Sequence, residues 1–339
     1  MPTIKDIAAL AKVSSATVSH VINKTRYVSD EVIERVNQAM DELGYTPNYL
    51  ARSLRQGKTN TIGLLMPDSS NPYFAELGLA IEKAAFKLNY NVILCNTESK
   101  QEKELLYIDV LSQKQVDGII FVSTGNNLES IEYMISKKIV FVMIDRELSV
   151  YQEFDFPLVL TDQFAGGQMA AEHILSLGHK RIACVTGPSF LTPSSQREKG
   201  FRQALQDAGV PVIEELIVKG DFLPESGYRA IHGFMSCKEP PTAVFACNDL
   251  MAFGVIRGAN EAGLSIPDDL SVVGYDNIHL AAYASPSLTT VSLPNDDIAE
   301  SAMHLLIAAF KKELTENKIC LQASLVSRES SGELIIKNN

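Results

Sequence analysis

Residues 3–23 read TIKDIAALAKVSSATVSHVIN, and this stretch decides how the amino-terminal part of the chain folds. Apolar side chains recur at helical spacing over residues 4–11, where Thr3 can cap the first free backbone amides. After a three-residue break, Ser14 can cap a second helix over residues 15–22. Two helices joined by so short a turn predict a helix-turn-helix.

A third helix and a short basic segment follow. Residues 29–31, SDE, are typical of a helix start, and Gly44 is typical of a helix end. Between them the apolar side chains recur at helical spacing, as Val32, Val36, Met40 and Leu43. We therefore expect a small all-α helix-turn-helix head over residues 1–46. Residues 47–58 form a separate segment that is too short to be a stable helix alone.

From residue 61 onward the chain alternates between strand-like and helix-like segments. Continuous apolar runs of strand length are separated by helical stretches at residues 75–88, 103–113, 166–177, 195–208 and 249–262. This alternation is typical of doubly wound parallel sheets, which helices cover on both faces. There are too many units for one sheet, so we expect a two-lobed α/β body with crossings near residues 161, 291 and 321–323. The expected lobes are residues 61–161 with 292–321 and residues 162–291 with 322–339.

Composition excludes several classes of protein. The chain has 339 residues, of which 46% are hydrophobic and 21% charged, and these fractions are ordinary for a globular protein with a sizeable core. The longest apolar runs are much shorter than a membrane span, and the first residues lack an export signal, so we expect a cytoplasmic protein without a membrane partner. Five widely spaced cysteines without a CxxC pair indicate core thiols, and we expect neither a metal nor a cofactor.

The net charge of −11 is unevenly distributed along the chain. Residues 1–60 carry eight basic and six acidic side chains, so the remainder carries the whole negative excess. A head that is more basic than an acidic body suits a protein that meets phosphate at one end. The charge pattern therefore allows a nucleic-acid partner for the head in spite of the negative total.

Several motifs lie in a dense pattern along the chain. In the head they are TIKDIA at residues 3–8, TVSHVIN at 17–23 and GYTPN at 44–48, and in the body NPYF at 71–74 and GYD at 274–276. Together they resemble the lactose-repressor (LacI/GalR) family over essentially the whole chain, and within it the ribose repressor and, next, the purine repressor. The resemblance implies a DNA-binding transcriptional repressor whose type I, periplasmic-binding-protein-like sensor takes a small effector.

The expected DNA contacts centre on the second helix, because a helix-turn-helix presents the start of that helix to base edges in the major groove. Ser15, Ala16 and His20 are available for bases, and His20 is the leading base reader, with a capping or packing role as the alternative. The resemblance implies that Arg26 contacts the operator. Without the resemblance, an arginine in a loop is more often a charged side chain that faces solvent. The full expected set is Thr3, Ser14, Ser15, Ala16, Thr17, Ser19, His20, Asn23, Arg26, Tyr45, Asn48, Ala51, Leu54 and Arg55.

The family resemblance implies that residues 48–56 are a hinge. It also implies that this hinge folds into a helix on operator binding, pairs with the same helix of the second protomer and lies in the minor groove. Leu54 is a wedge of the kind that enters a base step, and Arg55 adds charge in the groove. An ordinary linker is the alternative interpretation. Coupling of this kind requires a homodimer on a palindromic operator of double-stranded DNA.

The expected effector site lies where ligands bind in doubly wound lobes, at the carboxyl ends of the strands. Polar and aromatic side chains follow several strands there, beginning with Asp68 after the first. Such groups bind sugar hydroxyls in pairs and cover the apolar faces of the ring. Singly, Tyr73 or Phe74 could be core residues and Asp276 a helix cap. The resemblance assigns to the cleft Asn71, Tyr73, Phe74, Asp145, Arg146, Arg197, Phe222, Asn248 and Asp276.

Two departures from the family pattern bear on the effector. The purine repressor has a base-reading arginine where this chain has Leu191, and ribose-binding proteins have a glutamine where it has Ser292. A purine is therefore disfavoured, whereas Asp145 and Arg146 favour ribose or a related pentose. A catabolite-control regulator of the same family is a further alternative, but its basic helix is here the uncharged MHLLIA at residues 303–308.

Two other classes of protein compete with a regulator. An enzyme on this scaffold calls for a GxGxxG, Walker or GxSxG motif or clustered metal ligands, and the sequence has none of these. A periplasmic sugar-binding protein matches the body but not the attached head. No leucine-heptad tail follows Ser330, so we favour a dimer over a tetramer.

Overall fold

The computed structural model of the chain describes residues 2–23, 25–45, 58–122, 128–145 and 156–335. The chain divides after Thr59 into two compact units. The smaller unit contains the predicted head, and the larger contains two sheets with their covering helices.

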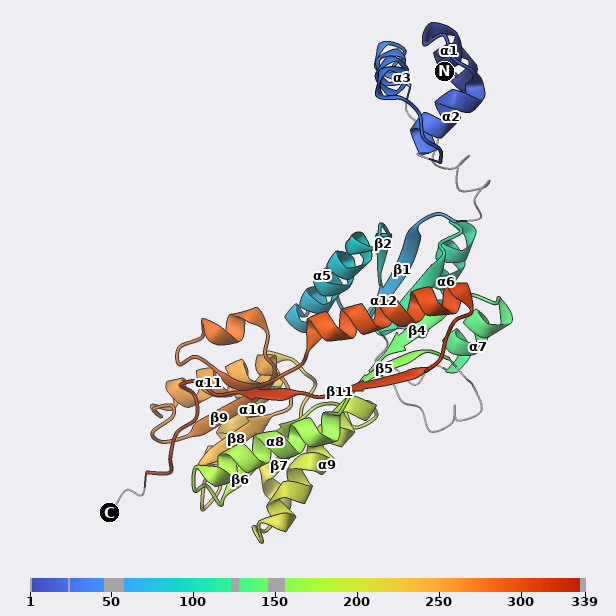
Figure 1. The fold of residues 1–339 in the computed structure, drawn as a ribbon. Coiled ribbons are helices and arrows are strands. Elements are labelled where there is room, and N and C mark those ends of the chain that lie inside the picture. The colour runs from blue at the N-terminus through green and yellow to red at the C-terminus, as the bar shows by residue number, and fades with distance from the viewer. Residues whose placement is uncertain (1, 24, 46–57, 123–127, 146–155, 336–339) are drawn as a thin grey trace. The chain divides into compact units, whose positions relative to one another are not determined.

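The described part of the smaller unit is a bundle of three helices, α1 (Ile4–Leu10), α2 (Ser15–Asn23) and α3 (Asp30–Glu42) (Figure 1). Their apolar faces meet around the fully buried side chains of Ile7, Val18 and Val36. Lys12 has a φ of 53°, which allows the tight turn between α1 and α2. The predicted helix-turn-helix is therefore confirmed.

The larger unit contains two sheets, each with six strands among the described residues (Figure 1). The first sheet has the order β11-β5-β4-β3-β1-β2 and is parallel throughout. Its strands are β1 (Thr61–Met66), β2 (Asn91–Asn96), β3 (Gly118–Val122), β4 (Phe141–Ile144), β5 (Leu158–Thr161) and β11 (Lys318–Leu321).

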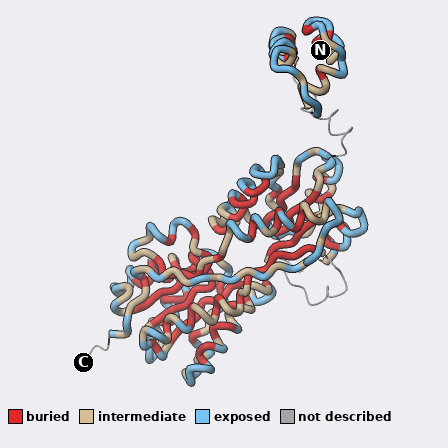
Figure 2. Tube along the Cα trace, viewed as in Figure 1, coloured by how far each residue is buried: buried red, intermediate tan, exposed pale blue. Residues whose placement is uncertain are grey.

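The second sheet has the order β12-β10-β9-β8-β6-β7 and is parallel except for the edge strand β12. Its strands are β6 (Ile182–Thr186), β7 (Ile217–Lys219), β8 (Ala243–Ala246), β9 (Ser271–Asp276), β10 (Thr289–Ser292) and β12 (Ser324–Val326). Throughout β3, β4 and β8 every residue is buried, as Figure 2 shows for the strands that run through both sheets. Burial on both faces explains the continuous apolar runs in the sequence.

Helices cover each sheet on both faces. In the first lobe α5 packs with α12 and α6 packs with α7, and in the second lobe α8 packs with α9 and α10 packs with α11. The helices are α5 (Pro72–Lys87), α6 (Gln101–Gln113), α7 (Leu128–Ser136), α8 (Gln163–Ser176), α9 (Thr192–Asp207), α10 (Pro224–Met235), α11 (Asp249–Glu261) and α12 (Asn295–Lys311), with short 3-10 turns at Glu214–Leu216 and His279–Ala282. The expected doubly wound, two-lobed fold class is confirmed.

Three helices begin three residues earlier than the apolar periodicity predicts. Helix α8 begins at Gln163 and not at residue 166, because the Asp162 side chain caps it. Helix α5 begins at Pro72 and not at residue 75, because the Asn71 side chain caps it and proline is tolerated at the first helical position. Helix α9 begins at Thr192 and not at residue 195, with Pro193 in its first turn. In α5 and α9 polar or proline residues open the helix, so the apolar stripe starts about one turn after the first helical residue.

Over its described residues the chain passes between the two sheets three times, from β5 into α8, from β10 into α12 and from β11 into β12. These passages lie side by side between the lobes (Figure 1). Among the described residues, no helix is both long and apolar enough to cross a membrane.

Candidate functional site

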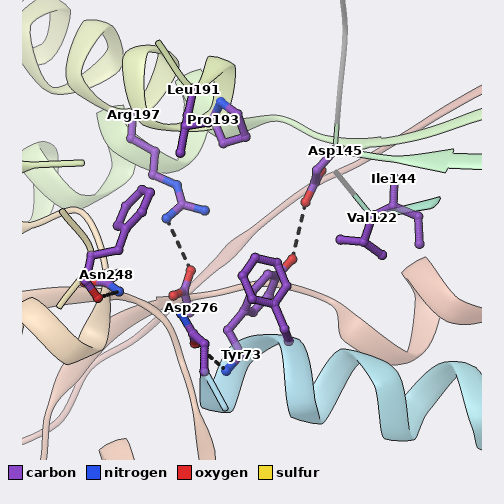
Figure 3. Close-up of a pocket in the computed structure, with 12 residues that line it drawn as sticks. Tyr73, Val122, Ile144, Asp145, Leu191, Pro193, Arg197, Asn248 and Asp276 are labelled. Carbon is purple, nitrogen blue, oxygen red and sulfur yellow. Dashed lines mark hydrogen bonds and ion pairs between the residues drawn. The ribbon is translucent and has the colours of Figure 1, made fainter. Parts of the chain in front are cut away.

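A pocket with a volume of about 70 Å³ lies between the two lobes, where the carboxyl ends of strands from both sheets face each other (Figure 3). By the space that one water needs, this volume holds roughly five to seven waters, so it suits a small ligand. The residues that line it are Asn71, Tyr73, Phe74, Val122, Ile144, Asp145, Leu191, Pro193, Arg197, Phe222, Asn248 and Asp276.

The most connected polar side chain of the pocket is Arg197, which is only 5% exposed. Its Nη1 donates to Asp276 Oδ1 at 3.2 Å and to the Cys247 carbonyl oxygen at 2.6 Å. Its Nε donates to Gln163 Oε1 at 2.7 Å, and its Cζ lies 3.7 Å from the centre of the Tyr275 ring. These contacts fix the guanidinium in one orientation beside the pocket (Figure 3).

A second polar pair comes from the other lobe. The Tyr73 hydroxyl of α5 donates to Asp145 Oδ2 at 3.3 Å, and the Thr161 backbone N–H donates to Asp145 Oδ1 at 2.8 Å. Asp145 has a φ of 54°, so the chain turns sharply as it leaves β4 and directs this carboxylate to the pocket. The pocket therefore has one carboxylate from each lobe, Asp145 and Asp276, and a buried arginine beside the second.

Burial raises the pKa of both carboxyl groups. The pKa of Asp276 rises to about 7 because burial outweighs the attraction of Arg197. The pKa of Asp145 is also raised by burial, against the hydrogen bond from Thr161. Burial, followed by the charge of Asp145, raises the pKa of the Tyr73 hydroxyl well above its usual value. A ligand that donates hydrogen bonds to these carboxylates would favour their charged forms.

Two asparagines of the pocket also open helices. Asn248 Oδ1 accepts from the Met251 backbone N–H at 2.9 Å, while its Nδ2 donates to the Phe222 carbonyl oxygen at 3.0 Å. Asn71 Oδ1 accepts from the Tyr73 backbone N–H at 3.0 Å. Each amide thus caps a helix and lies at the pocket wall, so its orientation is fixed by the backbone.

The pocket walls between the polar groups are apolar. The rings of Tyr73 and Phe74 lie 5.1 Å apart, centre to centre, on the α5 side. Phe222 has a φ of 67° and lies against Gly187, where a side chain would collide with its ring. Leu191 lies on the same lobe as Arg197 and brings no polar atom to the pocket.

Eight of the nine predicted effector residues line this pocket, and Arg146 lies outside the described residues. Asp68 does not line it and accepts a hydrogen bond from the Ser70 hydroxyl instead. Ser292 is also absent from the lining, and its hydroxyl accepts from Asn277. Asp276 ends β9 and pairs with Arg197, so the helix-cap interpretation of this residue is wrong.

Sequence reasoning missed two kinds of pocket residue. Val122 and Ile144 end the buried strands β3 and β4, and their exposure to the pocket depends on the opposite lobe. Pro193 is the second residue of α9 and lies two residues before the predicted start of that helix. Gln163, which holds Arg197, had no local signal beyond its position after a crossing.

The candidate DNA-reading surface lies on the head unit. Ser15 and Ala16, at the start of α2, are exposed, and Ser14 accepts from the Thr17 backbone N–H at 3.0 Å. His20 Nδ1 is 2.8 Å from the Thr25 hydroxyl, so this ring is oriented by a neighbouring loop residue.

The remaining predicted contacts of the head are also placed. Thr3 caps α1 through a capping box with Asp6. Asn23 Nδ2 donates to the Ser19 carbonyl oxygen at 2.8 Å. Arg26 is exposed and Tyr45 packs against the head core. The predicted hinge contacts Asn48, Ala51, Leu54 and Arg55 lie outside the described residues.

The part of the chain that the structure describes holds no group of three histidine, cysteine, aspartate or glutamate side chains placed to bind a metal ion. The pocket residues could instead bind a polar organic molecule. Two carboxylates and two amides offer hydrogen-bond acceptors and donors, and the aromatic rings offer apolar contact.

Comparisons with known proteins match the chain over almost its entire length. Residues 3–48 match the family described as bacterial regulatory proteins, lacI family, and residues 59–326 match periplasmic binding proteins and sugar binding domain of LacI family. The HTH-type transcriptional repressor PurR of Erwinia tasmaniensis is 41% identical over 333 residues, which cover 97% of each chain.

Two solved structures resemble the chain closely. The lac repressor dimer bound to operator and the anti-inducer ONPF has a TM-score of 0.87 and 26% identity, with coverage of 98% of this chain and 99% of that one. A LacI family transcriptional regulator from Enterococcus faecium with bound ribose has a TM-score of 0.72 and 33% identity, with coverage of 81% of this chain and 100% of that one.

Proposed function

The chain belongs to the LacI family and is a DNA-binding transcriptional repressor, and on that premise we propose that ribose or a related pentose in the pocket between its lobes controls its affinity for DNA. The single observation that carries this proposal is the pair of opposed carboxylates, Asp145 and Asp276, with aromatic rings between them. A neutral polyol has several hydroxyl donors for these acceptors and an apolar ring face for the aromatic side chains.

The size and charge of the pocket support a small neutral ligand. The volume of about 70 Å³ suits a single small ring better than a disaccharide. Arg197 already pairs with Asp276, and Asp145 would repel an anion, so a sugar phosphate is disfavoured. The related regulator from Enterococcus faecium binds ribose in its crystal structure, which adds support from a chain of 33% identity.

A purine is the second candidate, and the 41% identity to PurR repressors favours it. Tyr73, Phe74 and Phe222 could enclose an aromatic base between their rings. Against this candidate, the side chains of Leu191 and Pro193, at the start of α9, bring no donor to the edge of a base. The pentose therefore remains the preferred effector.

We further propose that the head reads the operator through α2, with His20 and the exposed Ser15 and Ala16 at base edges. The proposal takes residues 47–58 as the hinge and the chain as a homodimer on a palindromic operator. Its support is the lac repressor, whose structure has a TM-score of 0.87 to this chain and is a dimer bound to operator. Each protomer would then supply one major-groove helix to one half-site.

The proposal is tested by a thermal-shift screen of the full chain against ribose, other pentoses, hexoses, their phosphates, and purine bases. A ligand that binds only the folded protein raises the melting temperature. We expect ribose or a related pentose to give the largest shift and to change the retardation of a palindromic DNA probe in a gel-shift assay. If a purine raises the melting temperature and no sugar does, the purine replaces the pentose as the effector. If the chain does not retard the DNA probe at low salt, the proposed mode of DNA binding is wrong.

A further inference from the structure

The residue at the first crossing between the lobes is in contact with the pocket arginine. Gln163 is the first residue of α8 and directly follows the passage from β5. Its side chain is buried, with 6% exposure, although glutamine is mostly exposed in folded proteins. Gln163 does not line the pocket, so any influence on a ligand has to pass through a neighbour.

That neighbour is Arg197. Gln163 Oε1 accepts from Arg197 Nε at 2.7 Å. Nε is the guanidinium nitrogen next to the aliphatic part of the side chain, whereas Asp276 accepts from Nη1. With Nε and Nη1 occupied, Nη2 makes no hydrogen bond to the described part of the chain. The arginine therefore keeps one donor nitrogen for a ligand, and its direction depends on the bond to Gln163.

The amide of Gln163 is only half satisfied. Its Nε2 is buried without a partner among the described residues, and so is the hydroxyl of Tyr275, whose ring stacks on the same guanidinium. Gly166 lies three residues after Gln163 on the same face of α8 and leaves room for that hydroxyl, which a side chain would contact at 2.2 Å. A buried amide with an unused donor is costly, and such groups are usually retained for a role outside packing.

We propose that Gln163 is a positioning residue for effector recognition: it orients the Arg197 guanidinium toward the bound ligand and ties that orientation to the crossing between the lobes. This inference rests on the proposed function of the pocket, because it deepens how that site chooses its ligand. A change in the angle of the crossing moves Gln163, and Gln163 then moves the donor that the ligand needs.

The test uses the full chain and two readouts. The first is the Arg197 Nε–H signal in a proton–nitrogen NMR spectrum of deuterated protein, assigned by its loss in Arg197→Lys, because a buried and bonded Nε–H exchanges slowly with water. The second is the affinity for D-ribose by calorimetry. The variants are Gln163→Met, which keeps the side-chain length without the acceptor, and Gln163→Glu, which keeps the acceptor.

We expect Gln163→Met to abolish the slow exchange of the Arg197 Nε–H and to weaken ribose binding roughly tenfold, because one hydrogen bond to a charged group is lost. Gln163→Glu is expected to restore the slow exchange. The matched control is Gln168→Met on the same helix, whose Nε2 donates to the surface carboxylate of Glu172. It is expected to change neither readout.

Retention of the slow exchange in Gln163→Met, or ribose affinity within twofold of the parent, would overturn the inference. If the parent chain itself binds no ribose, the proposed pentose function fails, and the exchange of the Arg197 Nε–H still decides whether Gln163 orients the guanidinium. Unfolding of Gln163→Met is detected by its melting curve. If Gln163→Met unfolds, Gln163→Leu takes its place and is compared with Gln163→Glu. A slowly exchanging Arg197 Nε–H in the glutamate variant and not in the leucine variant supports the acceptor role of Gln163.

Discussion

The head and the pocket hold their polar side chains in opposite ways. In the head, the hydrogen bonds join neighbours in sequence, such as Ser14 with Thr17, three residues apart, and these groups are exposed. In the pocket, the bonds join residues far apart in sequence, such as Arg197 with Asp276, 79 residues apart, and these groups are buried. One region is an open surface on a small core, and the other is part of a core.

Because of this difference, we expect substitutions that impair DNA recognition and substitutions that impair ligand binding to have different effects on stability. An exposed side chain of the head can change without loss of burial, so we expect its variants to lose DNA recognition and keep the fold. A buried side chain of the pocket supports packing and ligand binding together, so we expect its variants to lose both. Substitutions in each region and the pH dependence of ligand binding test this contrast.

The strongest test is Arg197→Met. The substitution leaves the Asp276 carboxyl buried without its cation, so we expect a loss of roughly 3 kcal/mol in the free energy of unfolding, the lower end for a broken buried pair. Binding of D-ribose should weaken by roughly a hundredfold, because hydrogen bonds to a charged group are lost. Chemical denaturation and calorimetry measure the two effects.

The control for Arg197→Met is Arg229→Met, at an arginine whose side chain is 68% exposed and lies 3.8 Å from Asp221. It should leave stability and ribose binding nearly unchanged. Equal effects of the two substitutions would remove the distinction between buried and exposed polar groups on which the comparison depends.

His20→Ala tests the other side of the comparison. We expect roughly a tenfold or greater loss of affinity for a palindromic operator obtained by selection from random DNA, since one base contact is worth about 1–3 kcal/mol of discrimination. The melting temperature should not change, because the hydrogen-bond partner of the His20 side chain, within the residues that the structure describes, is Thr25 of the adjacent loop. Fluorescence anisotropy measures the affinity.

The matched control is His304→Ala, at an exposed histidine of α12 in the larger unit. It should leave operator affinity as in the parent chain. A drop in stability of His20→Ala without loss of operator affinity would assign His20 a packing role and contradict the prediction.

The pH dependence of ligand binding sharpens the description of the pocket. The pKa of Asp276 is about 7 in the folded protein and 3.8 in its ordinary state. A hydroxyl that donates to this carboxylate favours its charged form, so binding releases a proton and affinity for D-ribose rises with pH. If the bound pKa falls to about 5 or lower, the rise from pH 6 to pH 7 is about fivefold.

The same group makes the opposite contribution to stability. Between pH 3.8 and about 7 the folded protein binds more protons at Asp276 than the unfolded chain does. Its contribution to the free energy of unfolding therefore falls as pH rises through this window. Asp276→Asn should remove both dependences, and a pH profile of ribose binding that is flat in the parent chain would contradict the assignment.

Ser14→Ala is the smallest expected change. The Ser14 hydroxyl accepts from the Thr17 backbone N–H at 3.0 Å and so caps α2. Loss of an N-cap costs about 1 kcal/mol, which a chemical denaturation curve of the head transition can detect. Ser14→Asp, which keeps a capping acceptor, should restore the stability, and ribose binding should stay unchanged in both variants.

The contrast between the regions also explains how much the sequence could predict. The head follows from local signals, since caps such as Thr3 and Ser14 lie within a few residues of the amides that they bind. The two-lobed class follows from the alternation of buried strands with helices. The position of Gln163 against Arg197 could not be predicted, because the pair is 34 residues apart and meets only when α8 packs on α9. For the same reason, the sequence alone could not predict that Val122 and Ile144 line the pocket.

The third passage between the sheets has a consequence for synthesis of the protein. Strand β11 pairs with β5, but its residues 318–321 leave the ribosome long after residues 158–161 of β5. Until then the buried LVLT strand has an open edge, and the helix α12 that covers its sheet has only just been made. Open apolar edges favour pairing with other chains. The first lobe can therefore close only after residues 318–321 have been made, and until then we expect the open edge of β5 to be the site of the nascent chain most prone to pairing with other chains.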